Sequence, residues 1–334
     1  MGFSIKFALA LIGMAIVLAG CAGEPARKVD LSKIERNKAI ATQNGKCLGC
    51  KTSRPFEDQR EQTPHWVRTD MIRVAISGMI VPRETLGFYE ELLKYVGIRL
   101  AKRVELVQRR TYQEVNDLVE SGLVDVAFVC SLPYVLGRDN FGMELLVAPQ
   151  VNGETLYYSY IIARTDSVID SLEELRGKTF AFMDPDSNTG TLYPTYRLAQ
   201  LGEQPGNFFH HYLYTYGHDN SVKAVLNKLA DGAAVDSLVF DYMAARDRAV
   251  GTQIKVVEKS PPFGIPPVVV HPGLDPNLKE QLRRVFLDMD KDEMGKGILS
   301  RMGIDRFILP SDGAYDSIRV MYYMLKAKAL ESRR

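Results

Sequence analysis

The chain of 334 residues is long enough for about two domains, and its 46% hydrophobic and 25% charged residues are the composition of an ordinary globular protein. Its net charge of +1 provides no long-range field that would favour nucleic acid or an anionic membrane surface. We therefore expect no nucleic-acid partner, and any preference for an anion must come from a local site.

The N-terminus predicts export. Lys6 is followed by an apolar run, Phe7 to Leu18, which is short for a membrane span and has the length of a signal-peptide core. The run ends in Leu-Ala-Gly-Cys, which resembles a bacterial lipobox, so we expect residues 1–20 to be a lipoprotein signal peptide and Cys21 to carry a diacylglycerol. The alternative is a simple secretory peptide with Cys21 incidental. A lipid anchor would hold the protein at the bacterial cell envelope while its folded part stays in water.

Residues 21–69 are polar and lack sustained periodicity, which predicts a tether with a small extension. The extension contains Cys47 and Cys50, and export permits a disulfide between them. The same spacing is found in c-type haem attachment, but that motif needs a histidine next and Lys51 stands there. No second ligand pair follows for zinc. A redox or haem-bearing lipoprotein is therefore kept as an alternative, and no cofactor or metal is expected.

Strand and helix patterns alternate from Met71 onward, which predicts an α/β fold with parallel sheets. In the first series, strand patterns cover 72–77, 104–108 and 124–129, and helical spacing covers 84–104 and 111–122. The second series begins at 155–165 and includes helices at 171–177, 192–202 and 221–232, strands at 178–182, 208–216 and 254–259, and a strand or strand-to-helix junction at 233–240. A strand at 268–273 and helices from 276 onward close the chain.

Two α/β halves, a proline-rich connector at 260–267 and a helical ending predict two lobes. The C-terminal part would return to the first lobe, so that lobe 1 comprises 70–157 and 265–334 and lobe 2 comprises 158–264. A cleft between such lobes lies where strand ends and helix starts converge, which is the usual place for a ligand in open α/β sheets.

The sequence shows no sign of an enzyme. It contains neither G-x-S-x-G nor H-E-x-x-H. The Gly-Lys-Thr at 177–179 lacks the first glycine of a P-loop, because Leu172 stands at that position. His210 and His211 are neighbours on a predicted strand and would point to opposite faces, which disfavours a shared metal.

The segment "DPDSNTGTLYP" (184–194) places small polar residues where a strand meets a helix. A helix that starts near Thr189 has unpaired N–H groups and the positive end of its dipole there, which suits a tetrahedral oxyanion. The alternative is a helix that is capped by its own Ser187 or Thr189. Asp184 and Asp186 disfavour a fully charged anion and fit a partly protonated ligand or one that carries a cationic group. The predicted cradle consists of Ser187, Asn188, Thr189 and Gly190.

This segment resembles the Asp-Pro-[Asn/Asp]-Ser-Thr-Ser-Gly motif of the phosphate/phosphite/phosphonate-binding proteins of ABC transporters. The other landmarks of that family follow in the same order, and the resemblance extends from Met71 to Met324. They are "IRVAISG", "TYQEVNDLVESGLVDVAFVCSLPYV", "LEELRGKTFAFMDPDSNTG" and "GHDNSVKAVLNKLADGAAVDSLVFD". The resemblance implies a two-lobed type II periplasmic-binding fold, with a mostly parallel sheet flanked by helices in each lobe and a two-strand hinge that lets the lobes close on a ligand.

The resemblance also implies ligand contacts beyond the cradle, in which Asn188 stands where the family commonly has threonine. Tyr134 matches a pocket tyrosine, His218 a pocket histidine, and Asp236 a position that faces the ligand; Ser131 and Ser77 are additional hydroxyl donors. Each of the first three has a structural alternative, respectively a core or rim aromatic, a buried structural histidine and a helix N-cap.

Together these features predict a lipid-anchored extracytoplasmic protein that captures a small phosphorus oxyanion, namely a phosphonate, phosphite or phosphate, for the permease of an ABC importer. No cofactor is required. The alternative from a different class is a ligand-sensing lipoprotein of the same fold that reports to a membrane signalling protein.

Overall fold

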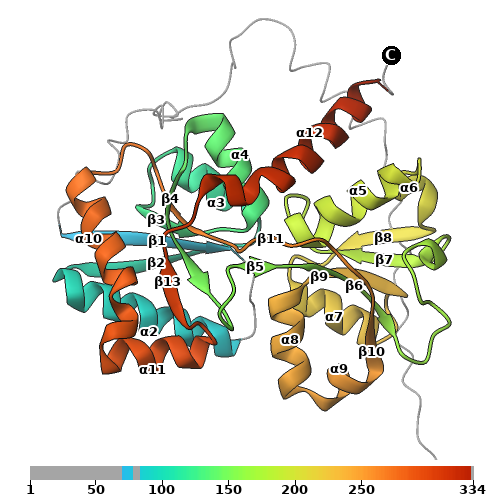
Figure 1. Cartoon of the computed structure of the whole chain (residues 1–334), viewed down its shortest axis with the longest axis horizontal. Coiled ribbons are helices and arrows are strands. Elements are labelled where there is room, and N and C mark those ends of the chain that lie inside the picture. Colours follow the sequence, from blue (N-terminus) through green and yellow to red (C-terminus); the bar gives the residue numbers. More distant parts are fainter. Residues whose placement is uncertain (1–69, 78–82, 332–334) are drawn as a thin grey trace, which may run out of the picture. The chain divides into compact units, whose positions relative to one another are not determined.

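The computed structural model describes residues 70–77 and 83–331. The predicted signal peptide, Cys21 and the Cys47–Cys50 pair lie outside these residues. Within them the chain forms two sheets that are each flanked by helices on both faces (Figure 1). We call each sheet with its helices a lobe. None of the described helices combines the length and the apolar character that crossing a membrane requires.

The first lobe is built on a six-stranded sheet in the order β13-β4-β12-β3-β1-β2. β1 is parallel to β2 and β3, whereas β12 runs antiparallel to β3 and β4, and β13 antiparallel to β4. The strands are β1 (Met71–Ser77), β2 (Arg103–Arg109), β3 (Val126–Phe128), β4 (Glu144–Gln150), β12 (Val268–Val270) and β13 (Arg306–Ile308). The helices are α2 (Arg83–Leu100), α3 (Tyr112–Glu120), α4 (Ser131–Phe141), α10 (Pro276–Leu287), α11 (Glu293–Met302) and α12 (Asp316–Glu331), with 3-10 turns at Met289–Lys291 and Asp312–Tyr315.

The second lobe is built on a five-stranded sheet in the order β10-β6-β9-β7-β8. β7 is parallel to β8 and β9, and β6 runs antiparallel to β9 and β10. The strands are β6 (Ser159–Arg164), β7 (Thr179–Phe182), β8 (His211–Tyr214), β9 (Gly232–Asp236) and β10 (Ile254–Lys259). The helices are α5 (Tyr193–Gln200), α6 (Pro205–Phe208), α7 (His218–Leu226), α8 (Ser237–Arg246) and α9 (Arg248–Gln253), with a 3-10 turn at Glu173–Leu175 and a π-helical turn at Asn188–Leu192.

The chain crosses between the lobes through two short strands, β5 (Leu156–Tyr157) and β11 (Phe263–Gly264), which pair antiparallel to each other. The strands that follow the crossings, β6 and β12, run against their neighbours, while most other strands of each sheet share one direction. The predicted fold class, a two-lobed α/β protein with a two-strand hinge, is confirmed.

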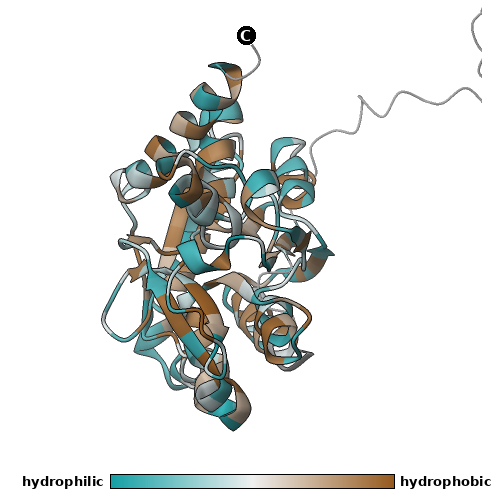
Figure 2. Cartoon of the chain, turned by 90° about the vertical axis from the view of Figure 1, so that its right-hand side faces the viewer, coloured by the Kyte–Doolittle hydropathy of each residue, from teal (hydrophilic) through white to brown (hydrophobic). Residues whose placement is uncertain are grey.

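The hydrophobic core is continuous between the lobes on one side only. One buried cluster contains residues from both lobes, among them Val115 of α3, Phe180 of β7 and Ile318 of α12. On the opposite face, the cluster beneath α2, α10 and α11 is separate from the one beneath α7, α8 and α9. The strands are the most hydrophobic part, and the helices alternate between hydrophobic and hydrophilic residues (Figure 2). The two lobes therefore adhere on the α12 side.

Several local predictions were wrong. The expected helix 171–177 is only a 3-10 turn, and the expected helix 221–232 begins earlier, at His218, and ends at Leu226. Helix α4 and strand β4 were not predicted, because Pro133 and Gly137 lower the helix propensity of the first and Pro149 lowers the strand propensity of the second.

Candidate functional site

The carboxyl ends of the central strands of both sheets lead to the candidate site. Ser77 ends β1, Cys130 follows β3, Met183 follows β7 and Asp236 ends β9. This edge is where open α/β sheets bind ligands, because helix N-termini and loop side chains converge on it.

Buried polar atoms without a partner gather at this edge. The side chains are at most 7% exposed, and the atoms have no hydrogen-bond partner among the described residues. Buried polar groups are usually paired, at a rate of about 90%, and an unpaired one costs about 1–3 kcal/mol. Several at one place therefore indicate a site built for a polar ligand. We call them the polar cluster: Ser77 Oγ, Tyr112 OH, Asn188 Oδ1, Thr189 Oγ1 and His218 Nε2.

Direct contacts connect the second-lobe part of the cluster to the hinge. The Asn188 side-chain amide donates to the hydroxyl of Tyr157 in β5 at 3.0 Å. That hydroxyl is 3.9 Å from Cys130 Sγ. Cys130 is buried and packs against Tyr112 of α3 and Met183. The site therefore spans from the second lobe through the hinge to the first.

His218 is held as a neutral hydrogen-bond donor. Its Nδ1 accepts the backbone N–H of Asp236 at 3.1 Å, so in the neutral ring the proton is on Nε2. Burial lowers the pKa of His218 to about 3, which keeps the ring uncharged at physiological pH. The unpaired Nε2–H can therefore donate to an acceptor such as an oxyanion, without adding a positive charge.

Asp236 has the structural role that the sequence left open. One carboxylate oxygen, Oδ1, accepts the N–H groups of Leu238 at 2.7 Å and Val239 at 3.3 Å, so Asp236 is the N-cap of α8. Burial raises its pKa to about 7, because a charged carboxylate is poorly solvated there. Capping and ligand contact are compatible, since the second oxygen is not used by the cap.

The turn after β7 pairs one of the amides that the predicted cradle would offer. The Ser187 hydroxyl accepts the Gly190 N–H at 3.0 Å, so the capping alternative holds for this pair. Gly190 is closely packed. A Cβ on it would stand 2.4 Å from Met183 Cβ and 3.2 Å from the His218 ring, so its hydrogen is required for packing. The side-chain atoms of this turn that have no partner among the described residues are Asn188 Oδ1, Thr189 Oγ1 and Thr191 Oγ1.

Two predicted contacts have hydrogen-bond partners of their own within the protein. Tyr134 packs its buried ring against Tyr315 and donates its hydroxyl at 2.6 Å to Asp312, whose side chain is exposed. Ser131 donates to the Gly264 carbonyl at 2.7 Å and so braces the hinge strand β11. In this structure both side chains satisfy their hydrogen bonds within the protein.

Sequence reasoning missed two tyrosines. Tyr112 begins α3 directly after the N-cap Thr111, and burial raises the pKa of its hydroxyl, which keeps it a donor. Tyr157 lies in the hinge and is fully buried. Tyr112 could have been found from the sequence, because ligands in open α/β sheets bind at the carboxyl ends of the strands. β2 ends at Arg109, and Tyr112 begins the helix that follows it.

The polar cluster contains neutral donors and an acceptor but no cation. The hydroxyls of Ser77, Tyr112 and Thr189 and the His218 Nε2–H can donate, whereas Asn188 Oδ1 can only accept. The described residues also contain no group of three or more His, Cys, Asp or Glu that could hold a metal ion. An oxyanion bound here would be stabilised by hydrogen bonds, and it would need a hydrogen of its own to satisfy the acceptor.

The lobes already meet beside the cluster. The backbone N–H of Tyr112 in the first lobe donates to Asp184 Oδ2 in the second at 3.2 Å. The other oxygen of Asp184 accepts the Asp186 N–H at 2.9 Å. Next to this contact, the guanidinium of Arg110 lies over the Tyr216 ring at 4.4 Å from its centre.

The chain is similar in sequence to known binding proteins of transporters. Residues 79–315 match the sequence profile of periplasmic substrate-binding proteins of ABC phosphonate transporters. The chain is 28% identical over 252 residues to the phosphate-import protein PhnD of Mycolicibacterium smegmatis, an alignment that covers 69% of this chain and 78% of that protein.

Two solved structures share the fold. A binding-protein component of an ABC phosphonate transporter from Pseudomonas aeruginosa superposes with a TM-score of 0.71 and 24% identity, covering 76% of this chain and 85% of that one. PhnD1 from Prochlorococcus marinus, in complex with methylphosphonate, superposes with a TM-score of 0.70 and 18% identity, covering 77% and 98%.

Proposed function

Because the chain belongs to the family of periplasmic substrate-binding proteins of ABC phosphonate transporters, we propose that it captures a phosphonate, phosphite or phosphate outside the cytoplasm and delivers it to the permease of an importer. The family is one of transport proteins and not of enzymes. The observation that carries the proposal is the polar cluster, whose buried atoms are unpaired at the edge where both lobes and the hinge meet.

In the proposed complex, Thr189, His218, Tyr112 and Ser77 donate hydrogen bonds to the oxygens of the phosphorus group. Asn188 Oδ1 accepts a P–OH hydrogen, as does the second oxygen of Asp236 when ionised. A phosphorus oxyanion near neutral pH carries such a hydrogen, whereas sulfate and sulfonates do not. Leaving a buried acceptor unpaired costs about 1–3 kcal/mol, so the site should discriminate between the two classes by roughly ten- to a hundredfold.

A ligand screen tests the function. We expect phosphate, phosphite or methylphosphonate to raise the melting temperature of the purified protein, and sulfate to leave it unchanged. A ligand at a hundred times its dissociation constant stabilises the folded state by about 2.7 kcal/mol. A response to sulfate or to a sulfonate that exceeds every phosphorus compound, or no response to any of them, would overturn the proposal.

We further propose that the protein is anchored by a diacylglycerol on Cys21. The support is the Leu-Ala-Gly-Cys sequence directly after an apolar run of signal-peptide length. The full-length protein should appear in the membrane fraction, and Cys21→Ser should move it to the soluble extracytoplasmic fraction. Equal fractionation of the two forms would contradict the anchor. For Cys47 and Cys50 we propose a disulfide, which thiol titration before and after reduction would test.

A further inference from the structure

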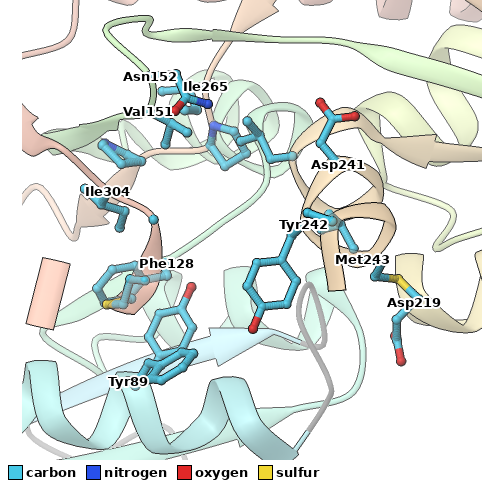
Figure 3. Close-up of a pocket in the computed structure, with 18 of the residues that line it drawn as sticks. Tyr89, Phe128, Val151, Asn152, Asp219, Asp241, Tyr242, Met243, Ile265 and Ile304 are labelled. Carbon is cyan, nitrogen blue, oxygen red and sulfur yellow. The ribbon is translucent and has the colours of Figure 1, made fainter. Parts of the chain in front are cut away.

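A second feature of the interlobe region is an apolar cavity beside the polar cluster. Its volume is about 480 Å³, within the range of small-molecule sites and much more than a phosphorus oxyanion alone would fill. The hinge segment Ile265–Pro267 forms one wall, and α8 of the second lobe faces α2 and β3 of the first. Tyr242 projects from α8 into the space opposite Tyr89 and Phe128 (Figure 3).

The cavity adjoins the polar cluster through neighbouring residues of the chain. Val129, in its lining, precedes Cys130, and Asp219 follows His218. Leu238 and Val239 also line it, and their N–H groups are those that Asp236 caps. An oxyanion in the polar cluster would therefore have the cavity at its side.

This cavity is not simply a gap between lobes that have yet to meet. The lobes are already joined at the buried contact between the Tyr112 N–H and Asp184, and by a core that is continuous on the α12 side. The cavity lies on the other face, where the clusters beneath α2 and α8 remain separate. The cavity therefore remains open although the two lobes are in contact.

The lining is suited to an uncharged, flat group. Phe88, Tyr89, Phe128, Tyr242 and Met243 contribute aromatic and thioether surface. Two charged residues of the lining have partners: Asp219 Oδ2 pairs with Lys223 at 2.7 Å, and the Arg246 guanidinium lies over the Tyr242 ring, itself part of the lining, at 3.8 Å from its centre. The other oxygen of Asp219, Oδ1, is buried and has no partner among the described residues, so this end of the cavity is polar. Asp241 hydrogen bonds to Tyr160.

We propose that the ligand is an organophosphonate with an apolar, preferably aromatic, substituent, and that this substituent lies in the cavity between Tyr242 and Tyr89. The proposal rests on the proposed function, because it takes the phosphorus group to be held by the polar cluster. It adds the substrate class: a substituted phosphonate, in preference to phosphate, phosphite or methylphosphonate.

Calorimetric titration of phosphate, methylphosphonate, 2-aminoethylphosphonate and phenylphosphonate tests this. Burying a methylene in an apolar site is worth about 0.8 kcal/mol, or about fourfold in affinity, so a ring of six carbons should bind at least tenfold tighter than a methyl group. Ala245→Trp should fill the cavity from an exposed position of α8, removing the advantage of phenylphosphonate while leaving methylphosphonate affinity within about twofold. Ala327→Trp, on the exposed face of α12, is the matched control and should change neither.

The outcomes separate the two proposals. If phenylphosphonate binds no tighter than methylphosphonate, or 2-aminoethylphosphonate binds tighter than both, the apolar subsite is wrong while the phosphorus site stands. If Ala245→Trp weakens all the phosphonates equally, the cavity is not specific to the substituent and the inference fails. If no phosphorus compound binds, the proposed function itself fails.

Discussion

The side chains of the polar cluster differ in what they can do for the folded protein. The His218 ring is oriented by the Asp236 N–H, so its Nδ1 contributes to the fold while Nε2–H remains for a ligand. Thr189 is simpler, because its hydroxyl is buried and has no partner among the described residues. A residue of this kind destabilises the unliganded protein and stabilises the complex.

Thr189→Val separates these two effects. Valine has nearly the same shape and lacks the hydroxyl, so the free energy of unfolding without ligand should stay equal or rise. The affinity for the phosphorus ligand should fall at least tenfold, because a hydrogen bond to a charged group contributes about 1.5–3 kcal/mol. Urea unfolding and calorimetry measure the two quantities.

Thr165→Val is the control for this substitution. The Thr165 hydroxyl donates to the Thr252 carbonyl at 3.2 Å on the surface of the same lobe. Its removal should leave the affinity unchanged. Equal affinities of the wild type and Thr189→Val would show that Thr189 does not contact the ligand.

The Asp236 carboxyl should give the protein a recognisable pH dependence. Its pKa is raised from 3.8 to about 7 by burial, so between these values the folded state holds a proton that the unfolded state has lost. Stability therefore decreases as pH rises through this window, by at most about 1.4 kcal/mol per pH unit from this group. Asp236→Asn keeps an acceptor oxygen for the Leu238 N–H but cannot ionise.

Urea unfolding at pH 4.5 to 8 measures this effect as the difference between two proteins. The difference in free energy of unfolding, wild type minus Asp236→Asn, should become steadily more negative up to about pH 7 and then level off. Taking the difference removes the contributions of other carboxyl groups, such as Asp186, whose pKa burial raises to about 6. Parallel pH profiles would contradict the assignment.

At the scale of elements, the junction from β7 to α5 positions the cluster. The chain turns after Met183, forms the π-helical turn and enters α5 at Tyr193. The Met183 N–H donates to the Gly190 carbonyl at 3.3 Å, and the Thr189 carbonyl accepts the Ser159 hydroxyl at 2.6 Å. The turn is therefore fixed to both β7 and β6, which presents Asn188 and Thr189 to the cleft.

Gly190→Ala tests how tightly this junction is packed. The new Cβ would stand 2.4 Å from Met183 Cβ, which is a steric clash. The backbone or the Met183 side chain must move to remove it. Overpacking of this kind costs about 1–3 kcal/mol. Gly206→Ala in α6 meets nothing within 4 Å and should change the free energy of unfolding by less than about 0.5 kcal/mol. Similar stabilities of the two variants would show that the junction adjusts without strain.

The sequence could predict these elements where the pattern is local. The strands β1, β2 and β7 and the helix α3 follow from hydrophobic spacing and from the Thr111 cap. Helix α4 could not be predicted from its sequence pattern. Its Pro133 is tolerated because it lies in the first turn, where a residue needs no partner for its N–H group. That position is known only once the start of the helix is known. The hydrogen bonds of Ser131 to the hinge and of Tyr134 to Asp312 could not be predicted either, because their partners are more than 130 positions away in the sequence.

For the whole molecule, the lobes are joined by the shared core on the α12 side and by a small number of polar contacts near the hinge. The hinge strands pair over two residues each, and Lys328 of α12 donates to the Ala199 carbonyl of α5 at 2.6 Å. Close to the cluster, the Asp184 side chain connects the lobes through the Tyr112 N–H, beside the contact of Arg110 with Tyr216. A ligand held by residues of both lobes would bind to this same arrangement of the lobes. The Asp184 contact, which stabilises that arrangement, should therefore increase the affinity for the ligand.

Asp184→Asn should therefore weaken binding without removing a group of the polar cluster. The asparagine amide has one acceptor oxygen where the carboxylate uses two, so either the Tyr112 N–H or the Asp186 N–H loses its partner. If the lost hydrogen bond is the one between the lobes, part of the binding free energy of the ligand is used to hold the lobes together. The affinity should then fall about five- to twentyfold, mainly because the ligand dissociates faster. Asp186→Asn removes a neighbouring carboxylate whose side chain makes no hydrogen bond in the described part of the chain, and it should change the dissociation rate less than twofold. Stopped-flow measurements of both variants with the same phosphorus ligand distinguish an effect on the contact between the lobes from an effect of charge. If only the lost negative charge mattered, both variants would bind the anion more tightly than the wild type.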